Sequence, residues 1–256
     1  MPSPPSAPLR LDILGAGPAY TDRPGAVGAA YLLRSATTAI VLDLGQGSFA
    51  RLAGELEPST VDAIFVSHLH PDHFIDLIAL RHYLRWEFHP ARHVRVIAPA
   101  GLAARLDDLH AEPGFTAATL DVEAVQVGLL HVGDLAIEAR RVAHTGDSYG
   151  YRVRLGEGPG LVYSGDCGRA EDLDALVRPC DTLLTEVSFG PGPVPPGAAH
   201  LDGPQVGALA SRTRARRVLL THLQMGFDRD ATIESVRAVY DGPVQLVEPG
   251  DHCAID

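Results

Sequence analysis

The stretch SHLHPDHF, residues 67–74, places three histidines and one aspartate within six positions, directly after the apolar run VDAIFV (61–66). Ionisable side chains at the end of a buried strand are costly unless something compensates them. A metal ion is the obvious candidate, because imidazole and carboxylate groups are common metal ligands. The alternative is a set of surface histidines that precede a helix.

Three further ligand-type residues stand in the same context, each after a predicted buried strand. They are His144 after 135–142, Asp166 after 160–164 and His222 after 217–221. With His68, His70, Asp72 and His73 they make seven, which is too many for one four-coordinate zinc. Seven ligands favour two ions that share one carboxylate. Because the later ligands also follow predicted buried strands, a set of scattered surface histidines is disfavoured.

Composition places limits on the class of protein. The chain of 256 residues has a hydrophobic fraction of 46% and a charged fraction of 21%, typical of one globular domain. Its net charge is -11 and every basic residue is arginine, which argues against a broad nucleic-acid footprint. RTRARR (212–217) is either a local basic patch or a solvated helix end.

Three cysteines without disulfide or zinc-finger spacing fit a reducing compartment, and we expect a cytoplasmic location. The Pro-rich start, residues 1–8, lacks the features of a secretory signal and is expected to be a disordered lead-in to a domain at 9–256. No apolar run is long enough to span a membrane, so no membrane partner is expected.

Short apolar runs alternate with helical patterns along the chain. The predicted strands are 9–14, 30–34, 39–44, 61–66, 94–98, 135–142, 149–154, 160–164, 182–187, 217–221 and 243–247. The predicted helices are 46–56, 74–87, 100–111, 168–177, 203–213 and 229–240, with Asp202 as the N-cap of the fifth. Continuously apolar strands such as AIVLDL are covered on both faces, which predicts an α/β fold with sheets between helix layers.

HLHPDH (68–73), the lone His144, SGDCG (164–168) and LLTHL (219–223) together resemble the metallo-β-lactamase fold over nearly the whole chain. The resemblance implies a four-layer αββα sandwich of two mixed sheets with two metals at their edge. It implies that His68, His70 and His144 bind the first ion. Asp72, His73 and His222 would bind the second, and Asp166 would bridge them.

The resemblance also implies hydrolysis. Asp166 stands where some antibiotic-hydrolysing members have a cysteine, and His70 stands where di-iron relatives have an acid. Both features favour hydrolytic metals over redox iron, zinc first and manganese as the alternative. Two such ions would generate hydroxide near neutral pH, and Asp72 would orient the nucleophile and accept its proton. Asp43, Glu186 and Ser67 are candidates for fixing the histidine rings, with ordinary strand-end or capping roles as the alternative.

His200, before the predicted helix 203–213, resembles the extra histidine of the ribonuclease Z and cyclic-nucleotide phosphodiesterase branch. The resemblance implies that it donates a proton or hydrogen bond to the scissile phosphate; a loop or helix-capping role is the alternative. Ribonuclease Z commonly inserts a tRNA-clamping arm between the lone His and the lone Asp, whereas residues 144–166 here form one short hairpin.

The sequence therefore favours a phosphodiesterase acting on a small phosphodiester such as cyclic AMP. The alternatives are a tRNA 3′-end endonuclease and a lactone or carboxylic-ester hydrolase. Cys167 replaces the Thr more usual after the Asp, and we expect it to be a packing residue. GAG (15–17) fails the dinucleotide pattern and is expected to border the metals.

Two segments keep open interpretations. The segment 188–200 is either a lid or a surface connection. His82, Trp86 and His89 are spaced for packing or for a homodimer face rather than a pocket wall.

Overall fold

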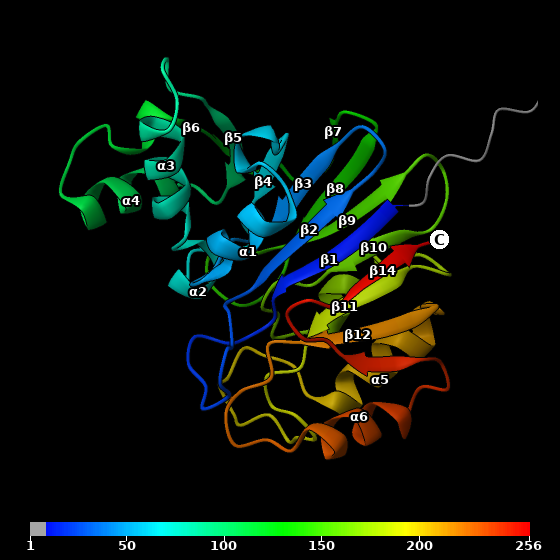
Figure 1. The fold of residues 1–256 in the computed structure, drawn as a ribbon. Coiled ribbons are helices and arrows are strands. Elements are labelled where there is room, and N and C mark those ends of the chain that lie inside the picture. The colour runs from blue at the N-terminus through cyan, green and yellow to red at the C-terminus, as the bar shows by residue number, and fades with distance from the viewer. Residues whose placement is uncertain (1–8) are drawn as a thin grey trace, which may run out of the picture.

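A computed structural model describes residues 9–256 as two seven-stranded sheets packed face to face (Figure 1). The first sheet contains β14 (His252–Ile255), β1 (Leu9–Gly15), β2 (Ala30–Arg34), β3 (Ala39–Leu42), β4 (Ala63–Phe65), β5 (Val94–Ala98) and β6 (Leu120–Ala124), in that spatial order. The second contains β13 (Val244–Leu246), β12 (Arg217–Thr221), β11 (Thr182–Glu186), β10 (Gly160–Tyr163), β9 (Tyr149–Leu155), β8 (Leu135–Arg141) and β7 (Gly128–Val132).

Both sheets are mixed. In the first sheet, β3 to β6 run parallel, whereas the pairs from β14 to β3 are antiparallel. In the second sheet, β10 to β13 run parallel, and β7 to β10 are antiparallel. Because β8 and β10 both pair antiparallel with β9, the strands β8, β10, β11 and β12 all end at the same edge of the second sheet.

Helices cover the outer face of each sheet and complete four layers. The helices are α1 (Ser48–Glu55), α2 (Pro71–Phe74), α3 (Leu77–Trp86), α4 (Leu102–His110), α5 (Gly203–Thr213) and α6 (Arg229–Arg237). Figure 1 shows α1, α3 and α4 on the side of the first sheet and α5 and α6 on the side of the second. One buried apolar cluster lies between the two sheets. Each sheet has one further cluster between its outer face and its helices. This arrangement confirms the predicted α/β class and the αββα sandwich.

The predicted strands are all present, but three strands escaped prediction: β6, β7 and β14. β6 and β7 lie at the outer edges of their sheets, and most of their side chains are half-exposed or exposed. β14 is also an edge strand, with an exposed His252 and Ala254. Edge strands of this kind carry mixed polar and apolar residues, so they show no continuous apolar run.

The predicted helix 168–177 is wrong as an α-helix, because only a 3₁₀ turn forms there, at Ala170–Leu173. The Asp172 carboxylate accepts a hydrogen bond from the backbone amide of Ala143 at 2.8 Å. The turn thereby holds the segment that carries His144. The predicted helix 74–87 is present as α3, which begins only at Leu77 because the separate short helix α2 occupies Pro71–Phe74.

Within residues 9–256, none of the helices is long and apolar enough to cross a membrane. The predicted lead-in, residues 1–8, lies outside the described residues.

Candidate metal centre

The strand ends bring all seven predicted ligands to one edge of the sandwich. His68 follows β4, His144 follows β8, Asp166 follows β10 and His222 follows β12. Parallel strands deliver the residues after their carboxyl ends to a shared edge, and that is why residues so distant in sequence meet here.

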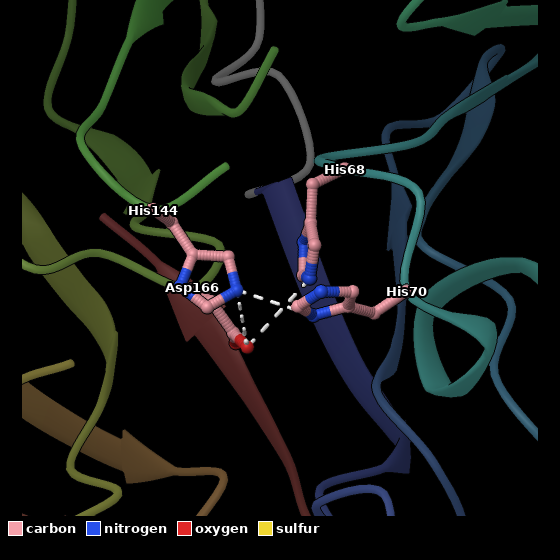
Figure 2. A group of neighbouring side chains, drawn as sticks. All are labelled: His68, His70, His144 and Asp166. Atoms are coloured by element: carbon pink, nitrogen blue, oxygen red, sulfur yellow. Dashed lines mark hydrogen bonds and ion pairs between the residues drawn. The ribbon is translucent and has the colours of Figure 1, made fainter. Parts of the chain in front are cut away.

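His68, His70, His144 and Asp166 form the first group (Figure 2), and their ligand atoms all lie within 4.8 Å of one another. His144 Nε2 is 3.2 Å from His70 Nδ1 and 3.5 Å from Asp166 Oδ2. His68 Nε2 is 3.7 Å from the same Asp166 oxygen. Nitrogens and an oxygen therefore surround one point, as ligands of a single ion would.

Asp72, His73 and His222 form the second group under the same distance limit. His222 Nε2 is 3.2 Å from Asp72 Oδ2. The other Asp166 oxygen, Oδ1, is 3.4 Å from His73 Nε2 and 3.5 Å from His222 Nε2. The two oxygens of one carboxylate thus face two ligand groups, so Asp166 could contact an ion in each.

A buried carboxylate orients the rings of His73 and His68. His73 Nδ1 donates to Asp43 Oδ2 at 2.7 Å. The Ser67 hydroxyl donates to the same oxygen at 2.7 Å and lies 3.1 Å from His68 Nδ1. Tyr163 donates its hydroxyl to Asp43 at 2.6 Å. Because Nδ1 of each ring is engaged, Nε2 is left to face the centre, as in other histidine metal sites.

The rings of His144 and His222 are fixed in the same way from the second sheet. His144 Nδ1 donates to the backbone carbonyl of Ala199 at 2.8 Å. His222 Nδ1 lies 3.1 Å from the Ser188 hydroxyl, which in turn donates to Glu186 Oε2 at 2.5 Å. Ser188 and Ala199 escaped prediction, and only the position of Ser188 just past a strand end signalled its role.

Three buried polar atoms lack a hydrogen-bond partner among the described residues, and all three belong to this centre. They are His68 Nε2, His73 Nε2 and Asp166 Oδ1. An unsatisfied buried polar group costs about 1–3 kcal/mol. A cation at each group would satisfy these lone pairs, so the residues present fit two metal ions.

The charges of the centre also favour bound cations. Asp43, Asp72 and Asp166 are buried, and within residues 9–256 their ion-pair partners are histidines rather than arginines. Burial lowers the pKa of His68, so its ring is a neutral donor. Burial also lowers the pKa of His73, but Asp166 and Asp43 outweigh it and raise that pKa. Bound cations would replace such protons, since metal binding displaces them from ligands.

The backbone is strained at two positions of this centre. His222 has φ of 58° and Asp43 has φ of 59°, a left-handed conformation that few residues other than glycine adopt. The His222 amide donates to the carbonyl of Ala16 at 2.9 Å, which anchors the ligand in this conformation. The GAG loop therefore borders the centre, as predicted.

Gly45 provides a test of how tightly the backbone supports the ligands. A Cβ at this position would lie 1.9 Å from the carbonyl oxygen of Asp72. Gly45→Ala should therefore displace the segment with Asp72 and His73, lower stability by about 1–3 kcal/mol and reduce metal content. Gly54→Ala is the matched control, because a Cβ there meets nothing within 4 Å and alanine favours the helix α1. Urea unfolding and elemental analysis should separate the two variants; equal behaviour would contradict the proposed support.

Cys167 is buried and its thiol donates to the carbonyl of Arg169 at 3.2 Å. It packs in the apolar cluster under α5, and no ligand group includes it. Its backbone amide donates to Glu186 Oε1 at 2.7 Å. The predicted packing role of Cys167 agrees with this placement.

His200 lies beside the seven residues, and its ligand atom is within 4.8 Å of those of Asp166 and His222. Its Nδ1 is 3.0 Å from Glu186 Oε1 and 3.9 Å from Asp166 Oδ2. Its ring lies parallel to that of His222, with centroids 6.0 Å apart. Burial lowers the pKa of His200, but its hydrogen bond to Glu186 and the charges of Glu186 and Asp166 raise it above the usual value.

Residues 40–223 match the family described as "Beta-lactamase superfamily domain". An uncharacterized protein of Mycobacterium leprae is 33% identical over 252 residues, which cover 95% of this chain and 87% of that protein.

Solved structures that share the fold include the following two. The metallo-beta-lactamase fold protein YhfI from Bacillus subtilis has a TM-score of 0.85 at 21% identity, covering 96% of this chain and 98% of that chain. The short form of human tRNase Z has a TM-score of 0.73 at 20% identity, covering 96% and 99%. The chain therefore belongs to the β-lactamase superfamily, as a metal-dependent hydrolase of the metallo-β-lactamase fold.

Proposed function

We propose that the chain hydrolyses a small phosphodiester, with a cyclic nucleotide such as cyclic AMP as the first candidate. In this proposal His68, His70 and His144 hold one divalent ion, Asp72, His73 and His222 hold the second, and Asp166 bridges them. The proposed ions are zinc, with manganese as the alternative. Two such ions supply a nucleophile near neutral pH and neutralise negative charge on the substrate.

The observation that carries the phosphodiester assignment is the pairing of His200 with Glu186 beside Asp166. A phosphodiester gains negative charge on its phosphoryl and leaving oxygens together, so a hydrogen-bond donor in addition to the metals stabilises the transition state. Glu186 holds the His200 ring through Nδ1 and favours its protonated form. The side chain is 17% exposed, so it can reach a bound substrate.

Asp72 has the second proposed role in catalysis. Its carboxylate is buried at the second group, where Oδ2 lies 3.2 Å from His222 Nε2 and 3.6 Å from His73 Nε2. A carboxylate held at that point can orient the attacking group and accept its proton. His200 would then act on the leaving oxygen.

Two features favour a small substrate over tRNA. The strands β9 and β10, between His144 and Asp166, are joined only by the turn 156–159, so no arm extends from this hairpin. The net charge of -11 also opposes binding to a polyanion. The similarity to tRNase Z keeps a tRNA 3′-end endonuclease as the second candidate.

A substrate panel with the Zn²⁺- or Mn²⁺-loaded protein tests the proposal. It compares bis-p-nitrophenyl phosphate, cyclic AMP, a pre-tRNA and a set of lactones and carboxylic esters. We expect the highest kcat/KM with a phosphodiester, and cyclic AMP turned over faster than the pre-tRNA. Faster cleavage of pre-tRNA would support the endonuclease, and faster hydrolysis of a lactone or ester would overturn the bond class.

A further inference from the structure

A cavity of about 290 Å³ lies next to the metal centre but contains none of the seven proposed ligands. Four segments far apart in the sequence line it: the loop 16–26, Arg51 of α1, residues 223 and 229, and the segment 246–249. The cavity is therefore a separate feature of the fold, built where the loop after β1 meets the end of β13.

Three arginines line this cavity, and among the described residues that line it Glu248 is the only acid. Arg229 pairs with Glu248 at 2.6 Å. Arg23 instead donates to the backbone carbonyls of Leu223 at 2.9 Å and the following residue at 3.2 Å. Arg51 has no ion pair and no side-chain hydrogen bond among residues 9–256. Two positive charges thus remain without a carboxylate partner, in a chain whose net charge is -11.

Arg229 is close enough to Arg23 to disfavour the charge of Arg23. Burial, and then the nearby Arg229, lower the pKa of Arg23. Like charges gathered in one cavity cost free energy unless an anion compensates them. The guanidinium group presents planar, paired donors that match the oxygens of a phosphate.

We propose that this arginine cavity, formed by Arg23, Arg51 and Arg229, binds a phosphate group, either as free phosphate or as a phosphate monoester. Arg23 and Arg51, which form no ion pair among residues 9–256, match the dianion that these groups form near neutral pH, whereas a carboxylate carries only one charge. The site lies outside the metal centre, and it stands whichever bond the metals hydrolyse.

The site is joined to the metal centre through backbone. Arg23 holds the carbonyls of Leu223 and Gln224, which directly follow His222. Ala16, in the wall of the cavity, accepts the backbone hydrogen bond of His222 at 2.9 Å. A phosphate bound to Arg23 would therefore stabilise the segment that positions this ligand.

Binding of radiolabelled inorganic phosphate to the metal-loaded protein tests the site. We expect two classes of bound phosphate, one at the metals and one in the cavity. Arg51→Ala should weaken the cavity class by about tenfold or more, as for loss of a charged hydrogen-bond partner, and leave the other class unchanged. Arg85→Ala, which removes an arginine of α3 outside the cavity, should change neither class.

Adenosine monophosphate and acetate distinguish the ligand classes in the same assay. If adenosine monophosphate competes with the labelled phosphate, and if Arg51→Ala weakens this competition, a monoester is identified as a ligand. Acetate should not compete. Arg51 is exposed and makes no polar contact with the other residues of 9–256, so its variant should fold, which circular dichroism can verify. The proposal is overturned if Arg51→Ala and the double variant Arg51→Ala with Arg229→Ala both bind phosphate with the same isotherm as the parent protein. The proposal is also overturned if the parent protein binds phosphate only at the metals.

Discussion

Asp166→Asn is expected to deplete both metal groups and to reduce hydrolysis at least about a hundredfold. The two oxygens of this carboxylate face different groups, with Oδ2 toward His68 and His144 and Oδ1 toward His73 and His222. An amide keeps the shape but removes the charge and one acceptor oxygen. Loss of an outer-sphere partner alone typically costs 10–100-fold in metal affinity or activity, so loss of the bridge should cost at least as much.

Elemental analysis of metal-loaded protein provides the measurement, and two further variants, His222→Ala and Asp181→Asn, are compared with Asp166→Asn. The parent should approach two equivalents per chain, and His222→Ala should lose mainly the second. Asp181→Asn is the matched control, because Asp181 is a buried carboxylate that pairs with Arg152 at 2.7 Å and belongs to no ligand group. It should lower stability and keep two metals per folded chain. Two equivalents and parent activity in Asp166→Asn would contradict the bridging role.

The ligand set could be predicted because its signal is local. Each ligand stands just past an apolar run, and a run such as RVLLT predicts a buried strand whose end lies at the sheet edge. Asp43 and Glu186 followed the same logic and do contact the histidine rings directly or through a serine. Asp202 caps α5 with Gln205 as its reciprocal partner, where the sequence predicted the cap.

Other features depend on contacts between segments that no local pattern encodes. The carbonyl of Ala199 orients His144 only because the end of the segment 188–200 folds back onto the loop after β8. This contact places the end of the segment at the centre, and nothing in it favours a lid over a surface connection. The arginine cavity likewise escaped prediction, since it needs Arg23, Arg51 and Arg229 to meet from three separate segments.

His200→Ala is expected to retain the fold and both metals but to lose about 10²–10³-fold in turnover of a phosphodiester, the usual cost of losing a transition-state donor. The loss should fall on kcat more than on KM, because the interaction strengthens as charge develops. His200 also lies within ligand distance of Asp166 and His222, so a role in metal binding is the competing explanation. Metal content separates the two explanations, since a donor can be removed without depleting either group.

Steady-state kinetics with bis-p-nitrophenyl phosphate and cyclic AMP, together with elemental analysis, complete the test of His200. The exposed His252 at the start of β14 provides the control, and His252→Ala should match the parent. Glu186→Gln should reproduce part of the His200→Ala loss, because its carboxylate holds the ring through Nδ1 at 3.0 Å. A His200→Ala protein with two metals and parent turnover would reduce His200 to a loop residue. A lactone or ester substrate would then be favoured, because the donor proposed to act on the scissile phosphate would contribute nothing.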